Sequence, residues 1–225
     1  MTATLISVAE LDEIVAAKRL LDHPFYQAWN SGELTMDELR DYAGQYYAFE
    51  AAFPRFLSAL HSRCDDATVR QTLLSNLWDE EHGADNHIAL WLRFAEGLGM
   101  TAEEVRSSAP REATTALIDT YAGLCSNGSI TEGIAALYAY ESQAHQVAVT
   151  KIAGLKTFYG IENERTISFF SAHIDADAAH SAAEADALNR LVDSEESWHQ
   201  VREATIRARD ALYDFLSGVP ISATG

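Results

Sequence analysis

The stretch "FEAAFPRFLSAL", residues 49–60, decides the fold class of this chain. Its large apolar side chains recur three or four positions apart, at Phe49, Phe53, Phe56, Leu57 and Leu60. That spacing places them on one face of a helix, whereas a half-buried strand would alternate apolar and polar residues. The spacing repeats in "LLSNLW", residues 73–78, and no segment shows sustained alternation. We therefore predict an all-α protein.

Start and stop signals divide the chain into helical segments. Capping boxes, with Glu three residues after Ser or Thr, are predicted at Thr35, Thr101 and Ser129. Stops fall near "GLGM", "SNGS" and "YGIEN", which carry Gly or Asn. With four prolines and 12 glycines, the chain has few residues that break long helices. The predicted bundle has seven to eight helices, covering residues 7–21, 23–30, 35–63, 66–97, 110–125, 130–157, 163–186 and 188–216.

Composition limits the number of domains, the partners and the location. A length of 225 residues with 48% hydrophobic residues fits one domain over residues 1–225. A net charge of −18 repels polyanions, so neither nucleic acid nor an anionic membrane is an expected partner. The start, "MTATLISVAE", lacks the blocks of a secretory signal, and no apolar run is long enough for a bilayer, so we expect a cytoplasmic protein. Cys64 and Cys125 are expected to be reduced structural thiols.

The segment "HIDADAAH", residues 173–180, indicates a metal site. On a helix that turns about 100° per residue, His173, Asp177 and His180 fall on one stripe. Glu80 and His87 are seven residues apart in "NLWDEEHGADNHIALW", so on a straight helix they would point within roughly 20° of each other. Two predicted helices can therefore direct ligands inward.

A third helix adds Glu141, in the most apolar part of the sequence, where a buried carboxylate needs a partner. The set then holds three carboxylates and three imidazoles. Such mixed donors suit iron or manganese, whereas structural zinc would draw on cysteine and calcium on oxygen alone. We predict two metal ions that share a carboxylate, with Glu141 as the expected bridge.

Each pattern alone also fits an ordinary solvated helix face. Other pairs have similar spacings: Asp79 with His82, Glu141 with His145, and Glu196 with His199. The last pair has the Glu-x-x-His spacing of ferritin-like bundles, whose sites use two such motifs, and this chain has one. A ferritin-like site is therefore kept as an alternative.

Five segments together resemble a known family: "HPFYQAWNSGELT", "FLSALHSRCDD", "NLWDEEHGADNHIALW", "GIAALYAYESQ" and "AHIDADAAHSAAEADAL". They are similar to the family of the Chlamydia protein associating with death domains, among the haem-oxygenase-like dimetal oxidases. Thiaminase II and pyrroloquinoline-quinone synthase are more distant members. The resemblance runs from about Leu20 to Leu216 and implies a haem-oxygenase-like helical bundle. It also implies dimetal ligands at Glu80, His87, Glu141, His173, Asp177 and His180.

The resemblance further implies a reaction. Family members are implicated in making para-aminobenzoate, the folate precursor, from a tyrosine of the protein itself. That tyrosine matches Tyr26, and the proposed amine donor matches Lys151. Tyr42 and Tyr140 match tyrosines that pass oxidising equivalents, whereas Phe169 stands where the family has a tyrosine. The implied cofactors are two irons, or manganese with iron, used with dioxygen and an external reductant. No free organic substrate is expected. The chain is expected to form a homodimer.

Two other functions stay open. A related oxidase would cleave a free fatty acid or amino acid, and it would turn over many times without losing mass from its own chain. A non-enzymatic interaction protein of the death-domain type would keep its partner after His173 and His180 are replaced. An oxidase would lose metal and product after the same change.

Overall fold

The computed structural model describes residues 7–222, except for the side chains of residues 175–178. That part of the chain is all-α, as predicted, and contains no strand. None of its helices is long and apolar enough to cross a membrane. A short 3-10 helix, η1, spans Leu20–Asp22. The α-helices of the described residues are α1 (Val8–Ala16), α2 (Pro24–Ser31), α3 (Met36–Glu50), α4 (Phe53–Arg63), α5 (Ala67–Glu81), α6 (His87–Gly97), α7 (Ala102–Arg106), α8 (Glu112–Ser126), α9 (Ile130–Tyr159), α10 (Glu164–Leu191) and α11 (Glu195–Ser217).

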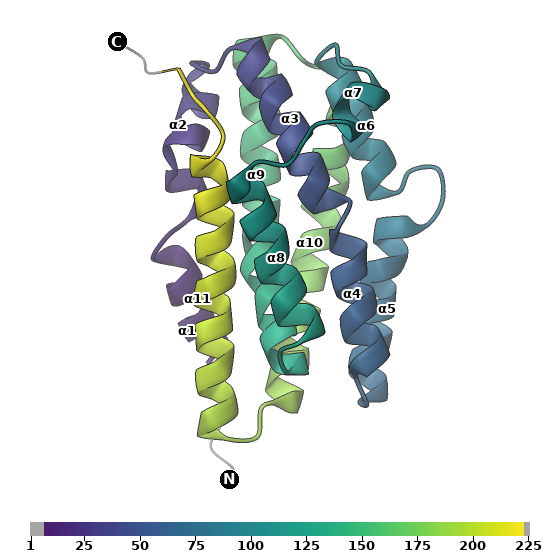
Figure 1. The fold of residues 1–225 in the computed structure, drawn as a ribbon, viewed down its shortest axis with the longest axis vertical. Coiled ribbons are helices and arrows are strands. Elements are labelled where there is room, and N and C mark those ends of the chain that lie inside the picture. Colours follow the sequence, from purple (N-terminus) through teal and green to yellow (C-terminus); the bar gives the residue numbers. More distant parts are fainter. Residues whose placement is uncertain (1–6, 223–225) are drawn as a thin grey trace.

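The prediction of seven to eight helices is too low, first because the segment 35–63 forms two helices, α3 and α4. Pro54 lies in the first turn of α4. Proline lacks an amide hydrogen, and its ring clashes with the carbonyl four residues earlier, so α3 cannot continue through it. Ala51 and Ala52 keep helical dihedral angles at the junction. The helix is therefore interrupted there, although Figure 1 shows α4 following α3 in nearly the same direction.

The segment 66–97 is likewise two helices, α5 and α6, joined by the loop that bulges to the right in Figure 1. His82 is extended, and Gly83 has a left-handed φ of 79°, which a residue with a Cβ atom rarely adopts. Asn86 then caps α6 by accepting a hydrogen bond from the amide of Ala89 over 2.9 Å. The helix is therefore interrupted between Glu80 and His87.

The three predicted capping boxes are confirmed. The side chains of Thr35, Thr101 and Ser129 each accept a hydrogen bond from the amide three residues later, and the glutamate there bonds back. The box at Thr101 begins α7, a five-residue helix that was not predicted. Start signals in the sequence therefore placed helix beginnings better than the apolar pattern placed helix interruptions.

The central helix of the bundle is α9. It packs against α10 and α11 and also contacts α8, α4 and α2, and its run from Gly133 to Glu141 is buried throughout. Gly154 lets α2 come close, because a Cβ atom at that position would lie 2.6 Å from the ring of Trp29. The indole of Trp29 also donates a hydrogen bond to the carbonyl of Lys151 over 3.2 Å. These contacts hold α2, which carries Tyr26, beside the second half of α9.

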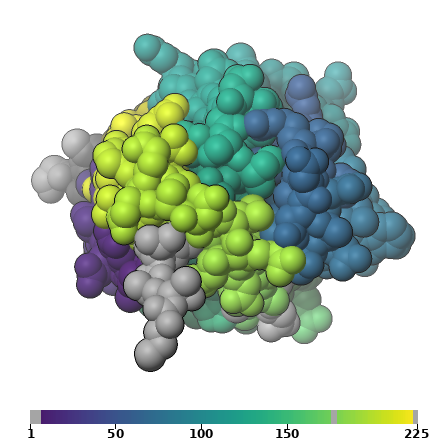
Figure 2. Space-filling view, turned by 90° about the horizontal axis from the view of Figure 1, so that it is seen from below, coloured from purple at the N-terminus to yellow at the C-terminus, as the bar shows by residue number. Residues whose placement is uncertain are grey.

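Polar contacts join the turns at the lower end of the bundle. Arg63, the last residue of α4, donates a hydrogen bond to the carbonyl of Cys125 in α8 over 2.8 Å. Arg190, near the end of α10, donates to the carboxylate of Asp66 before α5 over 2.6 Å. Figure 2 views this end, where the blue α4–α5, teal α8–α9 and lime-green α10–α11 segments lie side by side.

Candidate metal centre and tyrosine cavity

Glu80 and His87 meet across the break between α5 and α6. Both side chains are buried, and His87 Nδ1 lies 2.9 Å from Glu80 Oε1. The straight helix that we expected to align them is wrong, because the loop between His82 and Asn86 separates them. The two residues still converge, because Glu80 lies in the last turn of α5 and His87 begins α6. Burial and the neighbouring Asp79 raise the pKa of Glu80 well above its usual value.

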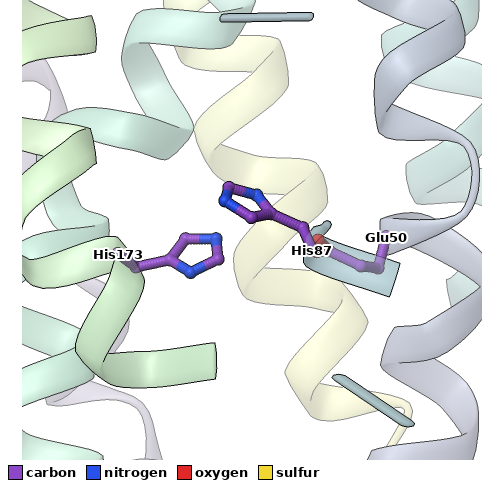
Figure 3. A group of neighbouring side chains, drawn as sticks. All are labelled: Glu50, His87 and His173. Atoms are coloured by element: carbon purple, nitrogen blue, oxygen red, sulfur yellow. The ribbon is translucent and has the colours of Figure 1, made fainter. Parts of the chain in front are cut away.

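His173, on α10, faces His87. The centres of their rings are 4.3 Å apart, and Figure 3 shows the two imidazoles pointing toward each other. His173 Nδ1 lies 2.7 Å from the carbonyl oxygen of Phe169, to which it must donate because a carbonyl only accepts. This bond leaves Nε2 as the unprotonated, metal-binding nitrogen of the neutral ring. Burial, followed by the charge of His87, lowers the pKa of His173 well below its usual value.

Glu141, in the middle of α9, lies near His180 of α10. One carboxylate oxygen accepts a hydrogen bond from the amide of Asn76 over 2.8 Å, and the other is 3.7 Å from His180 Nδ1. His180 Nε2 lies 3.0 Å from the carboxylate of Asp79. Burial is the main cause that raises the pKa of Glu141 to about 7, and the buried Glu184 is among the groups that act on this pKa. The structure thus adds Asn76, Asp79 and Glu184 to the surroundings of this carboxylate.

The side chain of Asp177, the sixth predicted ligand, lies outside the part of the chain that the structure describes. Of the six predicted ligands, the other five form two adjoining groups: Glu80 with His87 and His173, and Glu141 with His180. The charge of Glu80 also raises the pKa of Glu141, which indicates that the two groups are close.

Sequence reasoning missed Glu50, the last residue of α3. Its side chain is 2% exposed, and one of its oxygens lies within 4.8 Å of ligand nitrogens of both His87 and His173. Burial, and then the charge of Glu80, raises the pKa of Glu50 to about 8. The available signal was a single carboxylate inside the apolar face of "YYAFEAAF". That signal carried no metal-ligand spacing, because the partners of Glu50 come from distant helices.

The hydrogen bonding of the carboxylates is incomplete. Glu50 Oε1, Glu80 Oε2 and Glu141 Oε2 are buried and have no hydrogen-bond partner among the described residues. A buried carboxylate without a compensating partner costs free energy, which a bound cation would offset. Carboxylate and imidazole donors together fit iron or manganese. The residues present therefore suit the metal ions that the sequence implied.

A cavity adjoins this cluster. His173 and Phe169 line it from the side of the cluster, and Tyr26, Tyr42 and Lys151 line the rest together with apolar side chains. It offers about 40 Å³ to water-sized molecules, which is room for a few waters, whereas a cavity that binds benzene has roughly 150 Å³. In this conformation the cavity holds no free aromatic substrate.

Lys151 is buried beside tyrosines. Its side-chain nitrogen donates a hydrogen bond to the hydroxyl of Tyr42 over 2.6 Å and lies 5.4 Å from the ring centre of Tyr26. Tyr26 and Tyr42 also act on each other electrostatically: Tyr42 lowers the pKa of Tyr26, and Tyr26 raises that of Tyr42. Burial lowers the pKa of Lys151 to about 7, against an opposing effect of Glu50. A large fraction of the side chain is therefore a neutral amine near neutral pH.

Tyr140 is linked to Tyr46, which the sequence analysis did not select. Their hydroxyls form a short hydrogen bond, and Tyr46 also lowers the pKa of Glu50, one helical turn later on α3. Phe169, where the family has a tyrosine, packs on the ring of His173 at 4.0 Å between ring centres. A phenylalanine there supplies no hydroxyl, so among these residues the phenol near the cluster is Tyr46.

The remaining candidates lie elsewhere. His82 stacks on Trp78 at 3.8 Å between ring centres, and the exposed His145 contacts the carbonyl of Ile174. Glu196 and His199 are exposed on α11, so the ferritin-like spacing does not contribute to the cluster. Both cysteines are buried and free, and burial raises the pKa of Cys125 to about 12. A thiol with such a pKa is a poor nucleophile.

Known proteins resemble this chain in sequence and in fold. The chain is 43% identical over 215 residues to a 4-aminobenzoate synthase of Chlamydia muridarum, covering 96% of this chain and 90% of that protein. A CADD-like protein of unknown function from Nostoc punctiforme superposes with a TM-score of 0.78 at 20% identity, over 94% of each chain. A domain from Shewanella denitrificans with a haem-oxygenase-like fold superposes with a TM-score of 0.84 at 18% identity, over 95% of this chain and 92% of that one.

These superpositions confirm the predicted haem-oxygenase-like fold. The predicted resemblance to the family of the Chlamydia protein associating with death domains (CADD) is confirmed by the similarity to the 4-aminobenzoate synthase of Chlamydia muridarum and to the CADD-like structure. The sequence profile of the TENA/THI-4/PQQC family matches residues 9–219, nearly the whole chain. The protein belongs to the TENA/THI-4/PQQC family.

Proposed function

We propose that this protein forms 4-aminobenzoate, the para-aminobenzoate of folate synthesis, in a metal- and dioxygen-dependent oxidation of its own Tyr26, with Lys151 as the amine donor. The observation that carries the proposal is the position of the Lys151 amine. It is hydrogen-bonded to Tyr42 and lies over the Tyr26 ring, in a cavity that His173 of the carboxylate and histidine cluster also lines. The similarity to 4-aminobenzoate synthases supports the product.

The proposed ligands of two metal ions are Glu80, His87, Glu141, His173, Asp177 and His180. Two irons, or manganese with iron, would supply the capacity to oxidise a phenol side chain with dioxygen and an external reductant. The unpartnered oxygens of Glu80 and Glu141 support this assignment. His173 is held in the ligating tautomer by the carbonyl of Phe169. Glu141 as the bridge stays a prediction.

Lys151 has the properties of an amine donor. An amine is nucleophilic only when neutral, and burial lowers the pKa of Lys151 to about 7. The hydrogen bond to Tyr42 holds the nitrogen in place. Replacing the hydroxyl of a phenol by an amine requires a nitrogen source close to the ring, and the Lys151 nitrogen lies 5.4 Å from the centre of the Tyr26 ring.

The small cavity favours a substrate that belongs to the chain. Tyr26 is 3% exposed, and the space beside it accommodates a few waters and no free ring. Tyr42 and Tyr140 are proposed to pass oxidising equivalents to it. Because Phe169 has no phenol, we add Tyr46 to that route, on the basis of its hydrogen bond to Tyr140 and its effect on the pKa of Glu50.

The test is to load the purified chain with iron(II), or with manganese(II) and iron(II), and add reductant and oxygen without an organic substrate. We expect 4-aminobenzoate at up to about one molecule per chain and a matching mass loss at Tyr26, measured by mass spectrometry. Tyr26→Phe and Lys151→Arg should abolish the product. Tyr47→Phe, on α3, and Lys156→Arg, on α9 with Lys151, should not, because both residues lie outside the cavity lining.

Two results would contradict the proposal. Undiminished product from Tyr26→Phe would remove the self-consuming reaction. Many turnovers on an added fatty acid or amino acid, with the mass of the chain unchanged, would favour the related oxidase that uses a free substrate.

A further inference from the structure

The proposed reaction assigns no role to Glu50. Its neighbours in sequence, Phe49 and Phe53, are core residues, and Glu50 itself is almost completely buried. We propose that Glu50 is an additional metal ligand, and that with His87 and His173 it forms one of the ion positions of the centre. This inference rests on the metal-binding part of the proposed function and is independent of its product.

The first observation is convergence. One ligand atom each from Glu50, His87 and His173 lies within 4.8 Å of the other two, and all three side chains are buried. Figure 3 shows that they approach from three separate helices, α3, α6 and α10. Three such donors around one point are sufficient to begin a coordination shell for iron or manganese.

The second observation is that no described residue completes the hydrogen bonding of Glu50. Its Oε1 has no hydrogen-bond partner. The nearby amine of Lys151 gives its hydrogen bond to Tyr42 instead. A buried polar atom without a partner is rare in native structures and calls for an occupant such as a water or an ion. Two facing imidazoles identify a metal ion as the suitable occupant.

The third observation is the contact between His87 and Glu80. Their nearest ligand atoms are 2.9 Å apart, yet His87 Nδ1 forms no hydrogen bond of acceptable geometry. Adjacent ligands of an octahedral ion, each about 2.1 Å from it, lie about 3 Å apart. Close approach without hydrogen-bond alignment is therefore the arrangement expected of two donors that serve one ion, and Glu50 extends this donor set by one carboxylate.

Tyr46 is placed to orient Glu50. It has one hydroxyl proton, its oxygen is hydrogen-bonded to Tyr140, and it acts on Glu50 by lowering the pKa of that carboxyl. If Tyr46 donates to the carboxylate, then Tyr140 must be the donor to Tyr46, so both protons are used and both bonds are satisfied. Ligating carboxylates are commonly held by such a second bond. Glu50 thereby joins the ion position to the tyrosines of the cavity.

Metal binding tests this assignment without using the reaction. Anaerobic titration with cobalt(II), followed by visible absorption and metal analysis, gives the number of ions, their affinities and the change in ligand field. Wild-type protein should bind two ions per chain. Glu50→Gln introduces a neutral side chain of the same shape. It should weaken the binding of one ion by on the order of 10- to 100-fold and alter the spectrum of that ion. Glu162→Gln, in an exposed loop before α10, is the matched control and should bind as wild type does.

A second variant separates ligation from charge. Glu50→Asp keeps the carboxylate but withdraws it from the two imidazoles, so a ligand role predicts weakened binding of the same ion. Thermal unfolding of the metal-free variants checks their fold, and Glu50→Gln should be at least as stable as wild type because it buries no charge.

Either variant binding both ions with wild-type affinity and spectrum would overturn the assignment of Glu50. Wild-type protein that binds no ion would overturn both this inference and the proposed function. Protein that binds two ions through Glu50 but makes no 4-aminobenzoate would support the inference and overturn only the product.

Discussion

The amine of Lys151 donates a hydrogen bond to the hydroxyl of Tyr42 over 2.6 Å, inside a shell of aromatic rings. A lysine in such surroundings is difficult to keep charged, because aromatic side chains replace the water that would solvate an ammonium group. The protein therefore maintains, near neutral pH, an amine that a surface lysine would hold protonated. This property has a cost in stability, which can be measured.

We first predict that Lys151→Met stabilises the metal-free protein, by about 1 kcal/mol or more at pH 7. The folded-state pKa of about 7 is below the unfolded value of 10.5, so between these values the unfolded chain binds more protons. Wild-type stability must then rise with pH across that window. The advantage of the variant should be largest at and below pH 7, fall as the pH rises, and disappear by about pH 10.5. Denaturant unfolding at several pH values checks this, and an advantage independent of pH would contradict the shifted pKa.

We next predict that metal ions stabilise the protein. The unpartnered oxygens of Glu80 and Glu141 make the metal-free site costly, and an ion that binds only the folded chain adds about 2.7 kcal/mol at 100 times its dissociation constant. Manganese(II) or anaerobic iron(II) should raise the unfolding temperature of the wild type. The double variant His173→Ala, His180→Ala should lose most of that increase. An equal increase in both proteins would place the ions elsewhere.

The fold class and many helix starts could be predicted from the sequence because the causes are local. A capping box such as Thr35 with Glu38 is complete within four residues, and the apolar spacing of Phe49, Phe53 and Phe56 reports one helix face. Interruptions were harder to predict. The predicted helix over residues 35–63 runs through Pro54, where the structure has a break, and the break at Gly83 depends on a single left-handed residue.

The cluster was predictable to the extent that its residues carry spacing. His173 and His180 lie seven residues apart on one helix, and a histidine pattern is visible there. Glu50 and Tyr46 carry no such pattern, because their partners are on α6, α9 and α10. Only packing brings these helices together, so a site built from single residues on separate helices leaves little trace in one sequence.

A third prediction concerns Tyr46. Tyr46→Phe removes the hydroxyl that is hydrogen-bonded to Tyr140 and that lowers the pKa of Glu50, while the ring and its packing stay. We expect 4-aminobenzoate formation to slow by on the order of 10-fold, the factor that corresponds to about 1.4 kcal/mol, with both metal ions still bound. Tyr47→Phe, the neighbouring residue on the same helix, should retain the wild-type rate. A wild-type rate from Tyr46→Phe would show that oxidising equivalents do not pass this residue.

The last prediction concerns the loop between Glu80 and His87. Asn86 caps α6 directly before His87, so Asn86→Ala should cost about 1 kcal/mol of folding stability. It should also weaken metal binding, because fraying of the first turn of α6 releases His87 from its place beside Glu80 and His173. Asn163→Ala is the matched control, because it removes the cap of α10 at a position far along the helix from His173. It should lose comparable stability but retain its affinity for cobalt(II). Equal losses of affinity in the two variants would mean that metal binding follows overall stability and not the position of His87.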